Sequence, residues 1–246
     1  MTTLVLVHGG SCTGQYWDLL VPELSSESLA VDLPGRGSHP ADLHTVTLNE
    51  AVDSVAGDIS GIDDEIVIVA HSSGGLVVPG VVSQTKDKVR HVVLNAASVP
   101  PEGGQGLDCM HERHRDSVRA IGDMIAAGDP ITTPGEPPEP DRLRRAYGGA
   151  ELDDDQIAFL RDPIRFVPDT YNFYFSPVHW SSVAEIPVTY VLNLRDRAVP
   201  LSLQLEMIGR LPAPPRTIPL DVGHMPAVTM PVVLAALLDG IAAYPD

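Results

Sequence analysis

Short apolar runs recur along the chain, and longer stretches with helical spacing separate them. The runs are rich in β-branched residues and most lack alternating polar positions; they cover residues 4–7, 29–33, 66–70, 89–94, 188–192 and 216–220. Strands of this kind are buried on both faces, as in a parallel sheet that helices cover on each side. The pattern therefore predicts an α/β fold with a mostly parallel, doubly wound sheet flanked by helices.

Apolar residues three and four positions apart predict the connecting helices. These cover residues 16–24, 48–59, 201–211 and 230–243, and another apolar helix follows Ser72–Gly75 as far as about residue 82.

Residues 100–184 interrupt this alternation. They contain no convincing strand, but a polar helix candidate over 108–127 and a proline-rich stretch over 129–141. The segments over 142–148, 152–161 and 163–168 then lead to aromatic residues at 171 and 173–175. A long insertion between two core strands most often covers a ligand site. We therefore expect an α/β core of residues 1–99 and 185–246 and an inserted, mainly helical cap of residues 100–184.

Composition narrows the range of partners. The 246 residues are 43% hydrophobic and 20% charged, as in ordinary globular proteins, and the net charge of −17 argues against nucleic acid or an anionic membrane as a partner. The apolar runs are too short to cross a membrane, the first residues do not resemble a signal peptide, and Cys12 and Cys109 lack metal-ligand spacing. We expect a cytoplasmic protein without a metal site. The oligomeric state stays open, with a dimer as one option.

The sharpest local signal is a serine between a buried strand and a helix. The strand over 66–70 leads through His71 into Ser72-Ser73-Gly74-Gly75. This arrangement matches a nucleophile elbow, whose tight turn needs small residues two positions before and after the nucleophile. Ala70 and Gly74 meet that requirement, although Ala70 replaces the usual glycine. Ser72 is the predicted nucleophile, and the structural alternative is a helix N-cap serine.

A serine hydroxyl needs a base, and the base needs a carboxylate that orients it. His224 follows the last predicted strand and precedes the last helix, and Asp196 follows the strand over 188–192. The chain order Ser, Asp, His is the one expected when the nucleophile lies on an elbow. The alternative for Asp196 is a surface salt bridge with Arg195 or Arg197.

Acyl transfer also needs donors for the developing oxyanion. We expect the backbone N–H of Ser73 to supply one donor. The other should be the N–H of Gly10 in the loop over residues 7–11, where glycine lets the backbone approach a substrate closely.

Together these residues resemble the α/β-hydrolase superfamily over essentially the whole chain, in order. The resemblance rests on His8-Gly9-Gly10 with Trp17, Asp32-Leu33-Pro34-Gly35-Arg36-Gly37, the Ser72 elbow, Asp196 and His224. The His-Gly-Gly loop at the start of the chain is similar to the methylesterase and hydroxynitrile lyase branch. The resemblance implies a cofactor-free Ser-His-Asp enzyme with a helical cap.

Two positions separate the chemistries of that branch. Plant-type lyases carry lysine after the catalytic histidine and threonine in the oxyanion loop, whereas this chain has Met225 and Gly9. The resemblance therefore implies hydrolysis rather than cyanohydrin cleavage. Members that dehalogenate or open epoxides use aspartate at the elbow, which Ser72 argues against.

The sequence thus predicts a serine hydrolase acting on a carboxylic ester or lactone of a small, apolar substrate. The predicted substrate contacts are Gly9, Ser11, Phe175, Trp180 and Met225. An equally favoured alternative is that the aromatic residues only attach the cap to the sheet. Other functions left open are a thioesterase on a carrier-bound acyl chain, a lyase or cyclase, and ligand binding without turnover.

Overall fold

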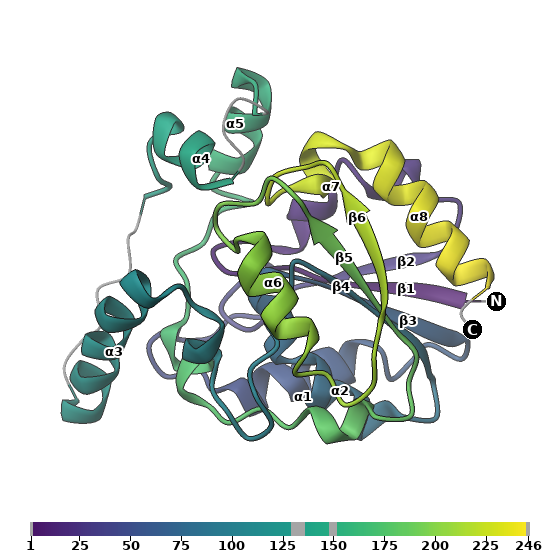
Figure 1. The fold of residues 1–246 in the computed structure, drawn as a ribbon, viewed down its shortest axis with the longest axis horizontal. Coiled ribbons are helices and arrows are strands. Elements are labelled where there is room, and N and C mark those ends of the chain that lie inside the picture. Colours follow the sequence, from purple (N-terminus) through teal and green to yellow (C-terminus); the bar gives the residue numbers. More distant parts are fainter. Residues whose placement is uncertain (1, 129–135, 148–151, 245–246) are drawn as a thin grey trace.

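A sheet of six parallel strands forms the centre of the fold (Figure 1). The computed structural model describes residues 2–128, 136–147 and 152–244, and its strands are β1 (Thr2–Val7), β2 (Ser28–Val31), β3 (Glu65–His71), β4 (Val89–Asn95), β5 (Val188–Asn193) and β6 (Arg216–Leu220). Their order is β2-β1-β3-β4-β5-β6, and every neighbouring pair is parallel. The predicted parallel sheet is confirmed. The strand order reverses between β1 and β3, and the crevice beyond their carboxyl ends is where such sheets bind ligands.

Alternate residues of the central strands pack against two different helical layers. On one face, Val5 and Ile68 belong to a core shared with α1 (Leu48–Asp58), α2 (Val78–Thr85) and α6 (Leu201–Ile208). On the other face, Leu6 and Val69 share a core with the 3₁₀ helix η1 (Gly14–Trp17), α7 (Pro226–Thr229) and α8 (Pro231–Ala243). Burial on both faces explains why the strands lack polar alternation.

Helix boundaries follow local signals. Thr47 begins α1 through a capping box, in which its hydroxyl accepts from the Glu50 N–H and the Glu50 carboxylate accepts from the Thr47 N–H. The single helix predicted over residues 16–24 is wrong. That stretch forms η1 and a second 3₁₀ helix, η2 (Val21–Glu23), because Pro22 has no N–H with which to continue an α-helix.

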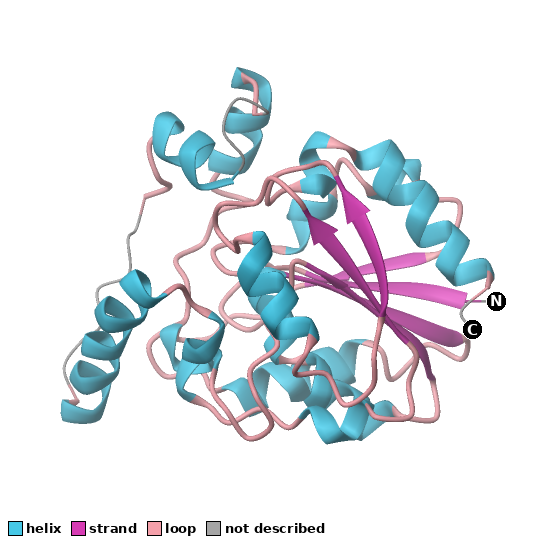
Figure 2. Cartoon of the chain, in the orientation of Figure 1, coloured by secondary structure: helices cyan, strands magenta, loops and turns pink. Residues whose placement is uncertain are grey.

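Short helices and loops make up the described part of residues 100–184 (Figure 2). They are η4 (Gly106–Cys109), α3 (Glu112–Ala127), α4 (Pro140–Tyr147), α5 (Asp154–Arg161), η6 (Tyr171–Phe175) and η7 (Trp180–Val183). Figure 1 shows α3, α4 and α5 on the side of the molecule where the strands end. Most of the proline-rich stretch over 129–141 lies outside the described residues. Of the helices that the structure describes, none has the length and apolarity needed to span a membrane.

Candidate active site

Ser72 lies in a strained turn between β3 and α2. Its φ of 52° is in the left-handed region, which residues with a side chain rarely adopt. A Cβ atom at Gly74 would lie 2.6 Å from the carbonyl oxygen of His8, and one at Gly9 would lie 2.8 Å from the Ser72 Cβ. Glycine at both positions therefore lets the loop after β1 pack directly against the turn. The chain continues as the 3₁₀ helix η3 (Ser72–Leu76) before α2 begins.

A hydrogen-bonded chain joins three side chains from three separate loops. His224 Nε2 lies 3.1 Å from Ser72 Oγ, and His224 Nδ1 lies 2.6 Å from Asp196 Oδ2. His224 and Asp196 are both buried. Because a carboxylate only accepts hydrogen bonds, Nδ1 carries the proton and Nε2 of the neutral imidazole can accept from the serine hydroxyl. The structure thus brings the predicted nucleophile, base and orienting carboxylate together.

Hydrogen bonds to both carboxylate oxygens hold Asp196 in position. Oδ1 accepts from the N–H groups of Ala198 and Val199, each at 2.8 Å, while Oδ2 faces His224. The surface salt bridge considered for Asp196 does not form with Arg195, whose Nε instead lies 2.9 Å from Asp221. Backbone donors therefore set the direction in which Asp196 presents its carboxylate.

Two further residues, His71 and Tyr147, hold His224 in place. His71 is buried and donates from Nε2 to the His224 carbonyl at 2.8 Å. Burial, and then the nearby His224, hold the pKa of His71 well below its usual range, so His71 is neutral. The N–H of His224 donates to the Tyr147 carbonyl at 2.6 Å, and the two side-chain rings stack with centroids 5.5 Å apart. Both contacts fix His224 from outside the hydrogen-bonded chain.

A cavity of about 280 Å³ opens over Ser72. The predicted oxyanion residues Gly10 and Ser73 line it, as do the predicted substrate contacts Ser11 and Met225. Its apolar wall also includes Met110, Val118 and Val199, which no sequence motif singled out.

The structure does not bring three of the predicted substrate residues to this cavity. Trp180 is only 1% exposed and packs with Val183 in the core on the face of the sheet that α1, α2 and α6 cover. Phe175 packs against Gly122, where its ring would lie 2.4 Å from an added Cβ. Gly9 lies against the Ser72 turn, and Gly10 rather than Gly9 lines the cavity. For Trp180 and Phe175 the structure favours the alternative of a packing role.

Tyr147, Asp169 and Tyr174 also line the cavity, and the sequence did not predict them as site residues. Tyr147 comes from α4, Tyr174 from η6, and Asp169 from the loop before η6. Tyr174 had been noted only as part of an aromatic cluster. None follows a core strand, so spacing along the chain carried no signal for them.

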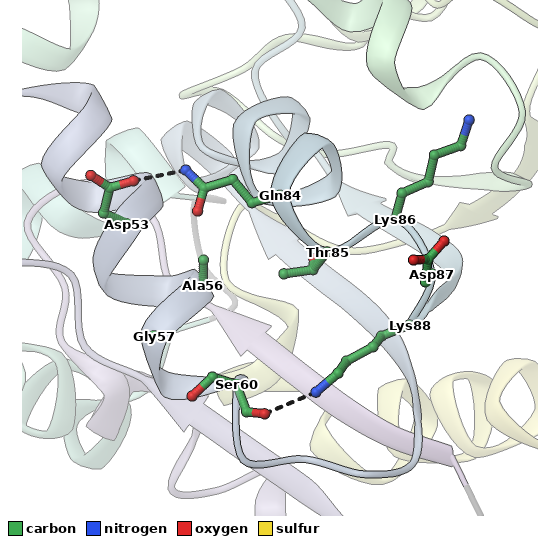
Figure 3. Close-up of a pocket in the computed structure, with 9 residues that line it drawn as sticks. All are labelled: Asp53, Ala56, Gly57, Ser60, Gln84, Thr85, Lys86, Asp87 and Lys88. Carbon is green, nitrogen blue, oxygen red and sulfur yellow. Dashed lines mark hydrogen bonds between the residues drawn. The ribbon is translucent and has the colours of Figure 1, made fainter.

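A second hollow, of about 490 Å³, lies beside the amino ends of β3 and β4, away from the strand ends that carry Ser72 (Figure 3). Several of its polar groups already have hydrogen-bond partners in the protein. Gln84 donates to Asp53 at 2.7 Å, and Lys88 donates to the carbonyls of Ser60 and Ile62. Since it contains no nucleophile paired with a base, it does not compete as the reactive site.

No group of three or more histidine, cysteine or acidic residues is placed to hold a metal ion in the described ranges. The two cysteines are buried, and burial raises the pKa of each thiol to about 12. Neither thiol is therefore an activated nucleophile.

Comparison with known proteins gives consistent matches. The sequence profile described as "Alpha/beta hydrolase family" matches residues 4–237. A pyrethroid hydrolase from Sphingobium wenxiniae is 24% identical, with 100% of this chain and 89% of that protein covered. Methylesterase 7 from Arabidopsis thaliana is 27% identical, over 97% of this chain and 95% of that protein.

Solved structures agree with the sequence matches. An extracellular alpha/beta-hydrolase from a Paenibacillus species superimposes with a TM-score of 0.79 at 23% identity, and both chains are covered completely. The architecture is therefore the α/β-hydrolase fold. The resemblance predicted from the His8-Gly9-Gly10 loop and the Ser72 elbow is confirmed.

Proposed function

Because the chain belongs to the alpha/beta hydrolase family, we propose that it is a serine hydrolase that cleaves a carboxylic ester or lactone of a small, apolar substrate. The observation that carries this proposal is the contact chain from Ser72 Oγ through the two nitrogens of His224 to Asp196, at 3.1 and 2.6 Å. The names of the similar proteins, a pyrethroid hydrolase and a methylesterase, favour an ester among acyl substrates.

In the acylation step, Ser72 Oγ attacks the carbonyl carbon while His224 Nε2 takes the hydroxyl proton. The imidazolium that forms keeps its Nδ1–H on the buried carboxylate of Asp196, which stabilises the positive charge. The Gly10 and Ser73 N–H groups stabilise the oxyanion, and losing one such donor costs about 3–4 kcal/mol of transition-state stabilisation. His224 then protonates the leaving alcohol as its bond to the carbonyl carbon breaks.

In the deacylation step, a water molecule takes the position of the alcohol. His224 Nε2 accepts its proton as the water oxygen attacks the acyl carbon, and it then returns a proton to Ser72 Oγ. For each water consumed, this cycle releases a carboxylic acid and an alcohol from an ester, or one hydroxy acid from a lactone. It uses only groups of this chain and water, and needs no cofactor.

The same proposal makes residues 100–184 the cap that shapes the substrate site. Met110, Val118 and Tyr147 come from this segment and line the cavity over Ser72. Together with Val199 and Met225 from the core segments, they favour a substrate with an apolar group close to its ester. The cavity volume of about 280 Å³ favours a small molecule over a long acyl chain.

Turnover of p-nitrophenyl esters with graded acyl length tests the proposal. We expect the wild type to favour short acyl groups and Ser72→Ala to lose up to about 10⁶-fold in kcat. Ser83→Ala, which changes an exposed serine on α2, is the matched control and should keep wild-type kcat. Folded wild-type protein whose rate does not exceed that of Ser72→Ala on esters, lactones and thioesters would contradict the proposal.

A further inference from the structure

The cavity over Ser72 contains a carboxylate that the proposed hydrolysis does not use. Asp169 lines the cavity with Ser72 and Gly10, and its side chain is 20% exposed. A Cβ atom at Gly10 would lie only 2.5 Å from Asp169 Oδ2, so this oxygen lies against the proposed oxyanion loop. A charged acceptor in this place must affect which substrates bind.

Three groups hold the Asp169 carboxylate in position. Oδ1 accepts from Arg36 Nη2 at 3.3 Å and from the Thr170 N–H at 2.9 Å, while Oδ2 accepts from the Tyr174 hydroxyl at 2.8 Å. Arg36 is itself buried and donates to the carbonyls of Cys12 and Pro34. The carboxylate is therefore a fixed part of the cavity wall.

The two oxygens differ in how fully they are used. A carboxylate oxygen has two acceptor positions. Oδ1 fills both with Arg36 and Thr170, whereas Oδ2 has Tyr174 as its one hydrogen-bond partner within the described residues. Oδ2 thus keeps one acceptor position, on the atom that lies beside Gly10.

Charge selects the kind of donor that this position favours. Arg36 already compensates the negative charge of Asp169, so a second cation would gain little there and would lose its hydration. A neutral hydroxyl gains a hydrogen bond to a charged acceptor without that cost. The same compensation keeps Asp169 from repelling the oxyanion that forms next to Gly10.

We propose that Asp169 is a specificity-determining residue that accepts a hydrogen bond from a hydroxyl group on the substrate, close to the scissile carbonyl. The preferred substrate is then a hydroxy ester rather than a purely hydrocarbon ester. This inference rests on the proposed ester hydrolysis and narrows its substrate class.

Matched substrate pairs test this inference. On the acyl side, methyl mandelate is compared with methyl phenylacetate, which lacks only the hydroxyl. On the alcohol side, the 2-hydroxyethyl ester of phenylacetic acid is compared with its propyl ester. In at least one pair we expect the wild type to favour the hydroxyl substrate by about 10- to 100-fold in kcat/KM, as for a hydrogen bond to a charged group.

Two variants attribute that preference to Asp169. Asp169→Ala removes the acceptor and should bring the ratio within about threefold of one, whereas Asp87→Ala, which changes an exposed carboxylate outside the cavity, should leave the ratio as in the wild type. Asp169→Asn covers the case in which the alanine variant does not fold. Its amide oxygen should stay on Arg36 and Thr170, which turns its NH₂ toward the cavity. Methyl α-methoxyphenylacetate, which accepts but cannot donate, should then gain relative to methyl mandelate.

The outcomes separate this inference from the proposed function. A wild type that hydrolyses these esters without favouring either hydroxyl substrate overturns the role of Asp169 and leaves ester hydrolysis standing. A hydroxyl preference that both folded Asp169 variants retain also overturns it. A wild type that turns over none of the esters contradicts the proposed function itself.

Discussion

Asp196 Oδ2 lies 2.6 Å from His224 Nδ1, although the two residues are 28 positions apart, in the loops that follow β5 and β6. The contact forms because the carboxyl ends of these neighbouring parallel strands meet at one edge of the sheet. Both side chains are buried there, and backbone N–H groups hold the other oxygen of Asp196. This relationship fixes the tautomer of His224, on which the proposed chemistry depends.

Asp196→Asn should therefore abolish most activity without unfolding the protein. The amide oxygen should accept from the Ala198 and Val199 N–H groups, which leaves the amide NH₂ facing His224 Nδ1. The imidazole would then carry its proton on Nε2 and could not accept one from Ser72. We expect kcat to fall by about 10⁴-fold, as measured on p-nitrophenyl esters.

Asp221→Asn is the matched control for this variant. Asp221 pairs with Arg195 at the surface and makes no contact with His224. Its variant should keep wild-type kcat. A folded Asp196→Asn variant within about tenfold of wild type would argue against the assigned tautomer.

Gly74→Ala should destabilise the protein. The added Cβ would lie 2.6 Å from the His8 carbonyl oxygen and 3.0 Å from that of Val7, and strand backbone cannot move aside easily. We expect a loss of about 1–3 kcal/mol in the free energy of unfolding, measured by urea denaturation.

Gly57→Ala serves as the comparison for that glycine. A Cβ at this position of α1 meets nothing within 4 Å, so the substitution should raise stability by up to about 1 kcal/mol. Equal effects of the two substitutions would show that the close packing at Gly74 is unimportant.

The pH dependence of stability should report the buried His8. Leu33 N–H donates to its Nε2 and Nδ1 lies 2.8 Å from the Gly9 carbonyl, so the ring is neutral. Burial and Arg36 lower its pKa to about 3. Unfolded histidine titrates near 6.5, so below that pH the unfolded state binds a proton that folded His8 does not. The free energy of unfolding should fall as pH drops from 6.5 toward 5, by up to about 1.4 kcal/mol per pH unit for each such histidine.

His8→Gln isolates this contribution. Urea titrations of both proteins between pH 7.5 and 5 should give a shallower slope for the variant, whatever its absolute stability. His71, whose pKa is also held well below its usual range, remains in both proteins and contributes equally. Identical slopes would contradict a neutral, buried His8.

The sequence places the proposed catalytic residues together better than it predicts the cavity walls. Ser72, Asp196 and His224 each follow a core strand, and parallel strands bring their carboxyl ends together, so position in the order of elements suffices to find them. The close approach at Gly74 was also predictable, because the strand-to-helix turn leaves no room for a side chain.

The cavity walls depend on how residues 100–184 pack, which has no repeating pattern along the chain. Large aromatic residues there suggested substrate contacts, yet Trp180 packs in the core while Tyr147 reaches His224. No local pattern distinguishes Asp169, because its partner Arg36 lies 133 residues away. Contacts of such long range are set by tertiary packing, which local sequence does not encode.

Labelling with a fluorophosphonate probe is the most direct test of the central claim that Ser72 is an activated nucleophile. Intact-mass analysis and peptide mapping should find one adduct per chain, on Ser72, that forms at least tenfold more slowly in His224→Ala and not at all in Ser72→Ala. Folded wild-type protein in which Ser72 stays unlabelled, or in which labelling persists in Ser72→Ala, would contradict the account.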